Sequence, residues 1–255
     1  MMYQTIDNNF NLHANKIPKQ TDRMYVFHSD SLSYVDAGLS CDTFNILHIH
    51  QNTTTDQELL SAVHYYKERN LDYCIWVNDE NLTDDLKAIF KENDIECQGE
   101  ELGMVLDLEN YMQIKNELHK NIAIVNNEKM LSEYSNVIAS HWNPKDENVV
   151  AFYDKTSSHY LNSENRIELC VYYHNSIPAA TVELFPTDEN TIGIYGLATL
   201  EEFRGNGIGS ALMSFVLNIA KQKGYKYIIL QATEDGFGIY QNLGFKTHTT
   251  YYEFV

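Results

Sequence analysis

The most constraining feature of the chain is the glycine-rich stretch Arg204-Gly205-Asn206-Gly207-Ile208-Gly209. It follows an apolar run that ends near Leu200 and precedes a helix-like segment that begins at Ser210. Glycines crowded at a strand-to-helix turn allow several backbone amides to point at one anion. The dipole of the following helix adds positive potential at the same point. The stretch therefore predicts a strand, a turn and a helix that together hold a ligand carrying a pyrophosphate.

Two familiar phosphate-binding patterns do not fit this loop. A mononucleotide loop needs a lysine followed by Ser or Thr after its last glycine, but Gly209 is followed by Ser210 and Ala211. A dinucleotide fingerprint fits weakly, because Ser210 stands at its third glycine and no acidic residue ends a strand about 20 residues later. The remaining pattern, Arg-x-x-Gly-x-Gly, resembles the acyl-CoA loop of the GNAT superfamily of N-acyltransferases. The alternative is an ordinary Gly-rich turn.

The segments on both sides of the loop follow the order of elements in that family. Apolar runs predict strands over 191–200 and 225–232, with a helix over 207–221 between them. The run Ile239-Tyr240-Gln241-Asn242-Leu243-Gly244-Phe245 then resembles the family signature Leu-Tyr-x-x-x-Gly-Phe. Its Gly244 suits the left-handed residue that closes a helix.

The resemblance covers roughly residues 121 to 255. It implies a fold of the α/β (α+β) class, in which a mixed, mostly antiparallel sheet of the GNAT type is flanked by helices. The earlier part of this region is expected to form a strand over 119–125, helices over 128–141 and 146–160, and a hairpin of strands over 166–173 and 178–185. In the family, the paired helices form part of the acceptor pocket.

The N-terminal half shows a similar order of elements. We expect a strand over 44–50, a helix over 56–69, a strand over 71–77, a helix over 83–93 and a short strand over 104–108. The run Ile89 to Ile95 lines up with Ile239 to Phe245, but Phe90 stands where the other half has Tyr240.

The two halves differ at the loop. Residues 50–55, between the first strand and its helix, contain no glycine, and their side chains would keep a pyrophosphate away from the backbone. We therefore predict two tandem GNAT-like domains: a degenerate N-terminal domain over residues 1–115 and an acyl-CoA-binding catalytic domain over 116–255. A polar helical stretch over 110–119 is expected at the boundary. The alternative is an N-terminal half of generic α/β type whose element order matches by chance.

Cysteine and histidine usage gives no sign of a metal site. Cys41, Cys74, Cys97 and Cys170 have no paired spacing, which favours reduced, buried thiols over a disulfide framework. His48-Ile49-His50 places two imidazoles on one face of a strand, but no Cys or carboxylate stands nearby at ligand spacing. We therefore expect no bound metal.

Charge and hydropathy limit the possible partners. The formal net charge of −18 would repel a nucleic-acid backbone and would attract a cationic amine, although an acidic composition also serves solubility. The sequence contains no apolar run long enough to span a bilayer, and its N-terminus lacks the basic flank and apolar stretch of a secretion signal. We therefore expect a cytoplasmic protein with no nucleic-acid or membrane partner. Its oligomeric state cannot be read from the sequence.

The resemblance implies acetyl-CoA as the acyl donor, held along the strand and loop. In the family, the pantetheine arm pairs with main-chain groups near the end of the strand before the loop, here Leu197, Ala198 and Thr199. The expected pyrophosphate ligands are the amides of Arg204, Gly205, Asn206, Gly207, Ile208, Gly209 and Ser210. The far end of the cofactor is expected to contact Thr233, Gly236 and Phe237.

The resemblance also implies the acid and base. Tyr240 is the expected general acid, because a phenol is protonated at neutral pH and can donate to a leaving thiolate. Some family members carry a glutamate on the strand before the loop, where this chain has Ile194, Tyr195 and Gly196. Glu183 on the preceding strand is the replacement we expect as the base, and deprotonation through water stays open.

These features predict an N-acetyltransferase that moves the acetyl group of acetyl-CoA to a primary amine by direct attack in a ternary complex. The acceptor is a small-molecule amine or a protein amino group. The alternatives are a CoA-binding sensor without turnover and an interaction protein whose N-terminal half recruits a partner.

Overall fold

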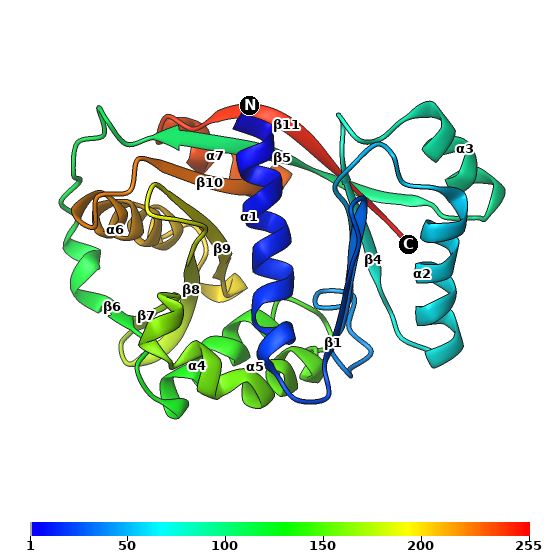
Figure 1. Cartoon of the computed structure of the whole chain (residues 1–255). Helices are drawn as coiled ribbons and strands as arrows, with labels where there is room; N and C mark the ends of the chain where they lie inside the picture. The colour runs from blue at the N-terminus through cyan, green and yellow to red at the C-terminus, as the bar shows by residue number, and fades with distance from the viewer. Residues whose placement is uncertain (1) are drawn as a thin grey trace. The chain divides into compact units, whose positions relative to one another are not determined.

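The computed structural model describes residues 2–255 (Figure 1). Its residues form two compact units. Unit 1 holds the residues up to Met104 together with Gln231–Phe237 and Thr247–Val255, and unit 2 holds Val105–Leu230 and Gly238–Lys246. Within both units the elements are of mixed α/β type and the strand pairs are mostly antiparallel, in agreement with the predicted fold class.

This grouping differs from a division between residues 115 and 116. The C-terminal strand β11 (Lys246–Phe254) pairs antiparallel with β4 (Cys74–Asn78), with Tyr251 opposite Asn78 and Phe254 opposite Ile75. Backbone pairing therefore places the last residues of the chain in unit 1, although they lie at the end of the C-terminal half of the sequence.

Unit 1 contains the following elements: α1 (Met2–Lys16), β1 (Tyr25–His28), β2 (Leu32–Asp36), β3 (Ile46–Ile49), α2 (Asp56–Arg69), β4, α3 (Asp84–Glu92), most of β5 (Cys97–Asp107), and β11. The strand order β1-β2-β3-β4-β11 is antiparallel except at the parallel pair β3–β4. The predictions for 44–50, 56–69, 71–77 and 83–93 are confirmed in type. The strand predicted at 104–108 is longer and begins at Cys97, and no element had been predicted for the first 43 residues, where α1, β1 and β2 lie.

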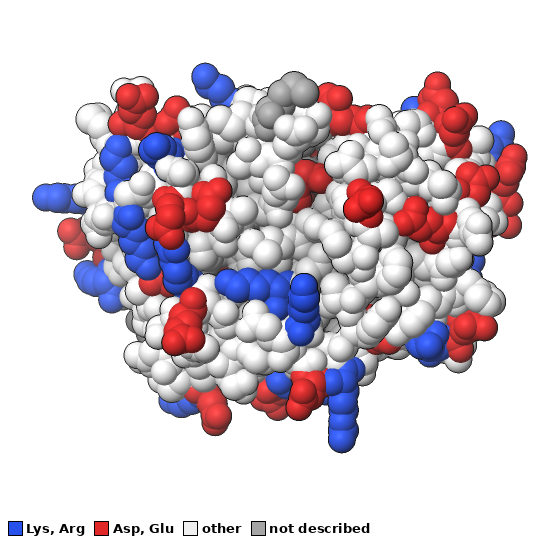
Figure 2. Space-filling model, in the orientation of Figure 1, with Lys and Arg blue, Asp and Glu red and all other residues white. Residues whose placement is uncertain are grey.

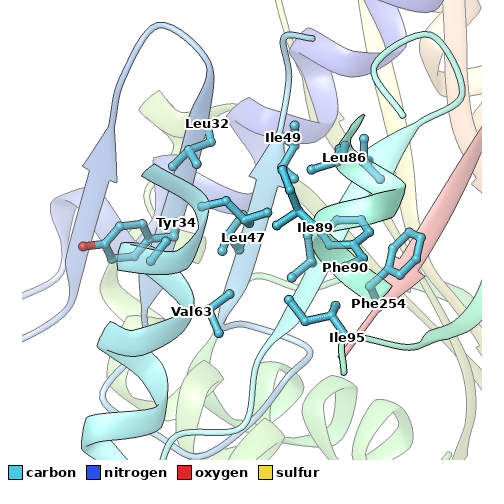
Figure 3. Close-up of a cluster of buried hydrophobic side chains, with 14 of the residues drawn as sticks. Leu32, Tyr34, Leu47, Ile49, Val63, Leu86, Ile89, Phe90, Ile95 and Phe254 are labelled. Carbon is cyan, nitrogen blue, oxygen red and sulfur yellow. The ribbon is translucent and has the colours of Figure 1, made fainter. Parts of the chain in front are cut away.

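The core of unit 1 lies between its strands and the helices α2 and α3. Leu59, Val63 and Tyr66 of α2 are buried, as the predicted apolar stripe requires, and Phe90 of α3 contacts Phe254 with ring centroids 4.3 Å apart (Figure 3). Burying such a cluster is the main source of stability of the unit, at about 1.5–3 kcal/mol per large apolar side chain.

Unit 2 contains β6 (Ile122–Ile124), α4 (Glu128–Ala139), α5 (Glu147–Tyr160), β7 (Glu168–His174), β8 (Ile177–Pro186), β9 (Thr191–Thr199), α6 (Ile208–Gln222), most of β10 (Tyr227–Ala232) and of α7 (Glu234–Asn242). The strand order β6-β7-β8-β9-β10 is antiparallel except at the parallel pair β9–β10. Helix α4 packs against α5 and on β7, β8 and β9, whereas α6 packs on β8 and β9 (Figure 1). The predicted elements of this region are confirmed in type.

The helix predicted over 110–119 is wrong. Residues 111–116 form no regular element, and only Glu117–Asn121 make a short 3-10 helix. The side chain of Asn218 on α6 accepts from the Ile114 amide and donates to the Ile114 carbonyl, at 3.1 and 2.8 Å. Because a side chain satisfies these backbone groups, they do not need the hydrogen bonds of a helix.

Candidate active site

A β-bulge in β9 is the first feature of the site. Thr181 of β8 lies opposite Ala198, but Glu183 lies opposite Tyr195, so Gly196 and Leu197 of β9 together oppose one residue of β8. Gly196 has a φ of +57°, and a Cβ at this position would lie 2.5 Å from the Tyr134 hydroxyl oxygen. Both the backbone conformation and the lack of space therefore require glycine here.

The bulge lies on a strand whose pairing is incomplete. The parallel register between β9 and β10 runs from Thr191 opposite Tyr227 to Gly193 opposite Ile229, whereas β9 continues to Thr199. The predicted pantetheine partners Leu197, Ala198 and Thr199 occupy this last part of β9 and are half-buried.

The loop after β9 ends in a helix that has no capping side chain. Gly205 and Gly207 have φ values of +75° and +72°, and a Cβ at either position would meet no atom within 4 Å. Gly207 is the N-cap of α6, it makes no side-chain cap bond, and the first turn of α6 contains no acidic residue. The first helical bond joins the Ala211 amide to the Gly207 carbonyl. The amides of the first turn before Ala211 therefore have no helical or side-chain cap bond, which is the arrangement that an anion site needs.

In unit 1, helix α2 connects the parallel strands β3 and β4, and it begins differently. Thr55 caps it by accepting from the Glu58 amide at 3.3 Å, and its first turn contains Asp56 and Glu58. The Glu58 carboxylate accepts from the Ser31 hydroxyl at 2.7 Å. Hydrogen bonds from Ser29 and Ser31 lower the pKa of Glu58 below its usual value, so this carboxylate stays charged at the helix start. The positive end of α2 is thus already occupied by the chain's own groups.

Two polar side chains of the loop hold its backbone in place. The Nε atom of Arg204 donates to the Thr199 carbonyl at 3.0 Å, and the Asn206 side-chain amide donates to the Phe203 carbonyl at 3.0 Å. Arg204 is exposed. It therefore joins the loop to the end of β9, and its free guanidinium nitrogens face solvent.

The loop lies beside the helix that carries Tyr240. A Cβ at Gly209 would lie 3.4 Å from the Cδ1 atom of Ile239 and 4.0 Å from the Thr199 hydroxyl. Tyr240 itself is buried, with its ring 5.8 Å from that of Phe245 in an edge-on arrangement. The helix closes at Gly244 with a φ of +94°, in agreement with the predicted left-handed residue. The structure thus brings the end of β9, the loop and the part of α7 from Gly238 onward together within unit 2.

The residues predicted for the far end of the cofactor lie where α7 begins. The Thr233 hydroxyl accepts from the Gly236 amide at 3.3 Å, and the Thr233 carbonyl accepts from the Phe237 amide at 3.0 Å. These three residues belong to unit 1, whereas the loop belongs to unit 2. Their contact with a cofactor stays a prediction.

Glu183 is a buried residue, and it is surrounded by tyrosines. It is 1% exposed. Burial raises the pKa values of Tyr134, Tyr153 and Tyr160 above their usual range, and the charge of the nearby Glu183 carboxylate raises them further. The sequence did not predict this cluster, because its members come from α4, α5 and β8. The seven-residue spacing of Tyr153 and Tyr160, two turns of α5, is the one local signal that could have indicated it.

The cysteine and histidine residues of the described chain do not form a second candidate site. Cys41, Cys74 and Cys170 are buried, as expected, but Cys97 is exposed because it begins strand β5 at the surface. Within residues 2–255 no group of three or more His, Cys, Asp or Glu side chains is arranged to hold a metal ion. His48 is buried with its Nε2 atom 3.1 Å from the Asp7 carboxylate.

The surface and the helices also bear on possible partners. Acidic and basic side chains are interspersed on the face drawn in Figure 2. Among the helices of residues 2–255, none combines the length and the apolar character needed to cross a membrane.

Known proteins resemble this chain in both sequence and fold. The model of the acetyltransferase (GNAT) family matches residues 130–245. Human N-acetyltransferase 8B is 35% identical over 74 residues, which is 26% of this chain and 33% of that protein. The match thus spans about a third of the length of this curated relative.

Two solved structures share the fold over most of the chain. A GCN5-related N-acetyltransferase from Kribbella flavida has a TM-score of 0.69 at 13% identity, with 96% of this chain and 94% of that chain covered. A tandem GNAT protein from the clavulanic acid biosynthesis pathway has a TM-score of 0.55 at 10% identity, with 91% and 81% covered. The family model thus identifies an acetyltransferase (GNAT) domain over residues 130–245, and the solved structures show that the chain shares the fold of these proteins.

Proposed function

We propose that the protein is an N-acetyltransferase that moves the acetyl group of acetyl-CoA to a primary amine in a ternary complex. The observation that carries the proposal is the uncapped start of α6, whose free amides follow a short loop after β9, and the last residues of β9 pair with β8 but have no register with β10. A pyrophosphate and an amide-bearing arm are the two groups that such an arrangement binds.

The residues of unit 2 fit this donor. The left-handed glycines Gly205 and Gly207 leave open space beside the loop, and no acidic side chain stands in the first turn of α6 to repel a phosphate. The amides from Arg204 to Ser210 would hold the pyrophosphate, and Leu197, Ala198 and Thr199 would pair with the arm. When bound, acetyl-CoA supplies an acetyl group activated as a thioester.

The chain's own groups then supply binding and proton transfer. A backbone amide in the β9 bulge polarises the acyl carbonyl, because a fixed donor in a protected site stabilises developing negative charge. The Tyr240 hydroxyl gives a proton to the departing sulfur, and Glu183 takes the proton that the attacking amine loses. The acceptor is a small-molecule amine or a protein amino group, and the cytoplasm is the proposed location.

We propose further that unit 1 is a degenerate GNAT-like domain that does not bind the donor. Its strands β1 to β4 repeat the antiparallel, antiparallel, parallel order of β7 to β10, with a helix between the last two strands in each case. Yet all residues of β3, from Ile46 to Ile49, pair with β4. The amides of His50 and Gln51 are bonded to the Ser31 carbonyl at 3.0 and 3.1 Å. No free strand end or amide cluster remains there for a ligand.

Two matched variants test donor binding. Gly207 and Gly224 stand at opposite ends of α6, both with positive φ and with no atom within 4 Å of an added Cβ. Both Gly207→Ala and Gly224→Ala should cost about 1–2 kcal/mol of stability through left-handed backbone strain. We expect only Gly207→Ala to weaken acetyl-CoA binding, by about tenfold or more, in isothermal titration calorimetry. Equal affinities for acetyl-CoA in the two variants would contradict the site.

Turnover separates the enzyme from a CoA-binding sensor. Free thiol release from acetyl-CoA is measured with a panel of amines that includes polyamines, amino acids, aminoglycosides and peptides with a free N-terminus. Amine-dependent thiol release supports the proposed function. Binding of acetyl-CoA without release by any amine would favour a sensor.

A further inference from the structure

We propose that unit 1 binds a small primary alkylammonium ion in a groove between the start of α2 and the strands β1 and β2. The groove is separate from the proposed acetyl-CoA site, because Phe27, Tyr34 and Glu58 belong to unit 1 and the glycine loop belongs to unit 2. Such a site gives a ligand to a unit that has no free strand end or amide cluster for the donor.

The groove has an aromatic side and a polar side. Phe27 of β1 and Tyr34 of β2 line it from the sheet, and Thr55, Glu58 and Ser61 line it from α2 and its cap. Its volume is about 380 Å³, within the range of sites that bind small molecules. An alkyl chain therefore finds rings to lie against, and an ammonium group finds oxygen atoms that accept its hydrogens.

The aromatic rings next to the groove already bind one cation of the chain. The Cζ atom of Arg69 lies 3.7 Å from the centroid of the Tyr65 ring. Tyr65 contacts Tyr34 with ring centroids 5.1 Å apart, and Tyr34 stacks on Phe27 with centroids 5.0 Å apart. Within residues 2–255 no lysine or arginine lies over Tyr34 or Phe27. These two rings can therefore attract a cation from solution, as the face of an aromatic ring does.

Glu58 gives the groove a fixed negative charge. Its carboxylate accepts from the Ser31 hydroxyl at 2.7 Å, and hydrogen bonds from Ser29 and Ser31 lower its pKa. Burial lowers the pKa of the nearby His50 to about 4, so this imidazole is neutral at pH 7 and does not balance the carboxylate. In the described part of the chain, Glu58 makes no ion pair. The groove therefore contains an ionised carboxylate without a cation.

The helix start does not oppose a cation here. The Thr55 hydroxyl accepts from the Glu58 amide at 3.3 Å, and the first turn contains the carboxylates of Asp56 and Glu58. Two full negative charges outweigh the positive end of the helix dipole, which is equivalent to about half an elementary charge. The formal net charge of −18 further attracts cations to the protein.

A primary ammonium group fits the polar side better than a quaternary one. It has three N–H donors, and the groove offers the Glu58 carboxylate and the hydroxyl oxygens of Thr55 and Ser61 as acceptors. The Ser61 hydroxyl donates its own hydrogen to the Gln57 carbonyl at 2.6 Å, so its oxygen can accept. A tetramethylammonium ion has no N–H group and leaves these acceptors without a donor.

Saturation-transfer NMR titrations of the full chain with n-butylammonium, at constant ionic strength and without acetyl-CoA, test the groove. We expect a dissociation constant of about 1–10 mM, as suits a ligand of this size. Glu58→Gln should weaken binding about tenfold, and Phe27→Leu about two- to fivefold. The matched controls are Glu68→Gln, which removes an exposed α2 carboxylate that pairs with His64, and Phe44→Leu, which alters a half-buried ring outside the groove. Both controls should stay within about twofold of the wild type.

A second pair of variants leaves the Glu58 hydrogen bonds in place. Ser61 is exposed, so Ser61→Lys brings a tethered ammonium to the groove and should weaken n-butylammonium binding about tenfold or more. His64→Lys adds the same charge to α2 outside the groove, where the new ammonium can pair with Glu68, and should change the affinity less than about twofold. Far-ultraviolet circular dichroism checks that each variant is folded.

The groove is overturned if Glu58→Gln binds n-butylammonium as tightly as Glu68→Gln does, or if Ser61→Lys binds it as tightly as His64→Lys does. Equal affinity for tetramethylammonium and n-butylammonium would also overturn it. Tighter binding of Nα-acetyl-lysine amide than of n-butylammonium would overturn the assignment to a free amine. Thiol release from acetyl-CoA is not part of these measurements, so the proposed acetyl transfer stands or fails separately.

Discussion

The contact between Gly196 and Tyr134 allows a quantitative test of the bulge. In Gly196→Ala the new methyl carbon would lie 2.5 Å from the Tyr134 hydroxyl oxygen and 3.4 Å from the Cδ1 atom of Ile138. The left-handed backbone costs an L-residue about 1–2 kcal/mol. Forcing the hydroxyl aside adds about 1–3 kcal/mol of overpacking. We therefore expect Gly196→Ala to lower the free energy of unfolding by about 2–5 kcal/mol.

Removing the hydroxyl should remove the overpacking. In the Tyr134→Phe background the nearest ring carbon of residue 134 stays at 3.7 Å, an ordinary contact, so Gly196→Ala should cost only about 1–2 kcal/mol there. The coupling energy of the double-variant cycle is then about 1–3 kcal/mol. It is measured by urea unfolding followed by far-ultraviolet circular dichroism.

The control is Gly224→Ala, where φ is +86° and no atom lies within 4 Å of an added Cβ. It should cost about 1–2 kcal/mol in both backgrounds. If Gly196→Ala costs the same with and without the Tyr134 hydroxyl, the bulge is not shaped by this contact and the reasoning fails.

Three further predictions follow from other parts of the structure. Tyr240→Phe should lower kcat for thiol release by about 100-fold with acetyl-CoA affinity unchanged, whereas an unchanged kcat would exclude Tyr240 as the acid. Thr55→Ala removes the cap of α2 and should cost about 1 kcal/mol in urea unfolding; a cost near zero would mean that Glu58 holds the helix start alone. Burial, and then the charge of Glu253, raises the pKa of Glu101 to about 7, above its unfolded value. The stabilisation from this group is present at acidic pH and is lost as pH rises through 7. The free energy of unfolding of the wild type should therefore fall between about pH 5 and 8. In Glu101→Gln this fall should be smaller, by at most about 3 kcal/mol. Parallel stability curves for the wild type and this variant would contradict that assignment.

The sequence predicted those helices whose ends and buried faces are determined by residues close together in the chain. The helix over 56–69 coincides with α2 because Thr55 caps its start and its apolar stripe is complete within the helix. The closure of α7 at Gly244 follows from one glycine with positive φ. Both features depend on residues within a few positions of each other, so a single sequence contains the information that specifies them.

Features that depend on pairing between distant segments were not predictable. The bulge at Gly196 exists only through the register of β9 with β8, and the cluster around Glu183 needs α4 and α5 to pack side by side. The strand β11 pairs with β4 from the opposite end of the sequence. Likewise, residues 111–116 contain good helix formers such as Met112, Gln113 and Lys115, but Asn218 of α6 binds the backbone of Ile114 instead.

The first turns of α2 and α6 differ in how their backbone amides are satisfied. Both helices connect the strands of a parallel pair, β3–β4 and β9–β10. At α2, Thr55 and the Glu58 carboxylate satisfy the helix start, which stabilises the fold and repels an added anion. At α6, Gly207 leaves the amides without a capping side chain, which costs the helix about a few tenths of a kcal/mol relative to a Thr cap, and these amides are the proposed pyrophosphate site. Although a 3-10 helix (Glu201–Phe203) lies only in the connection to α6, we propose that the first-turn residues decide which of the two helices binds an anion, because they determine whether its amides are already capped.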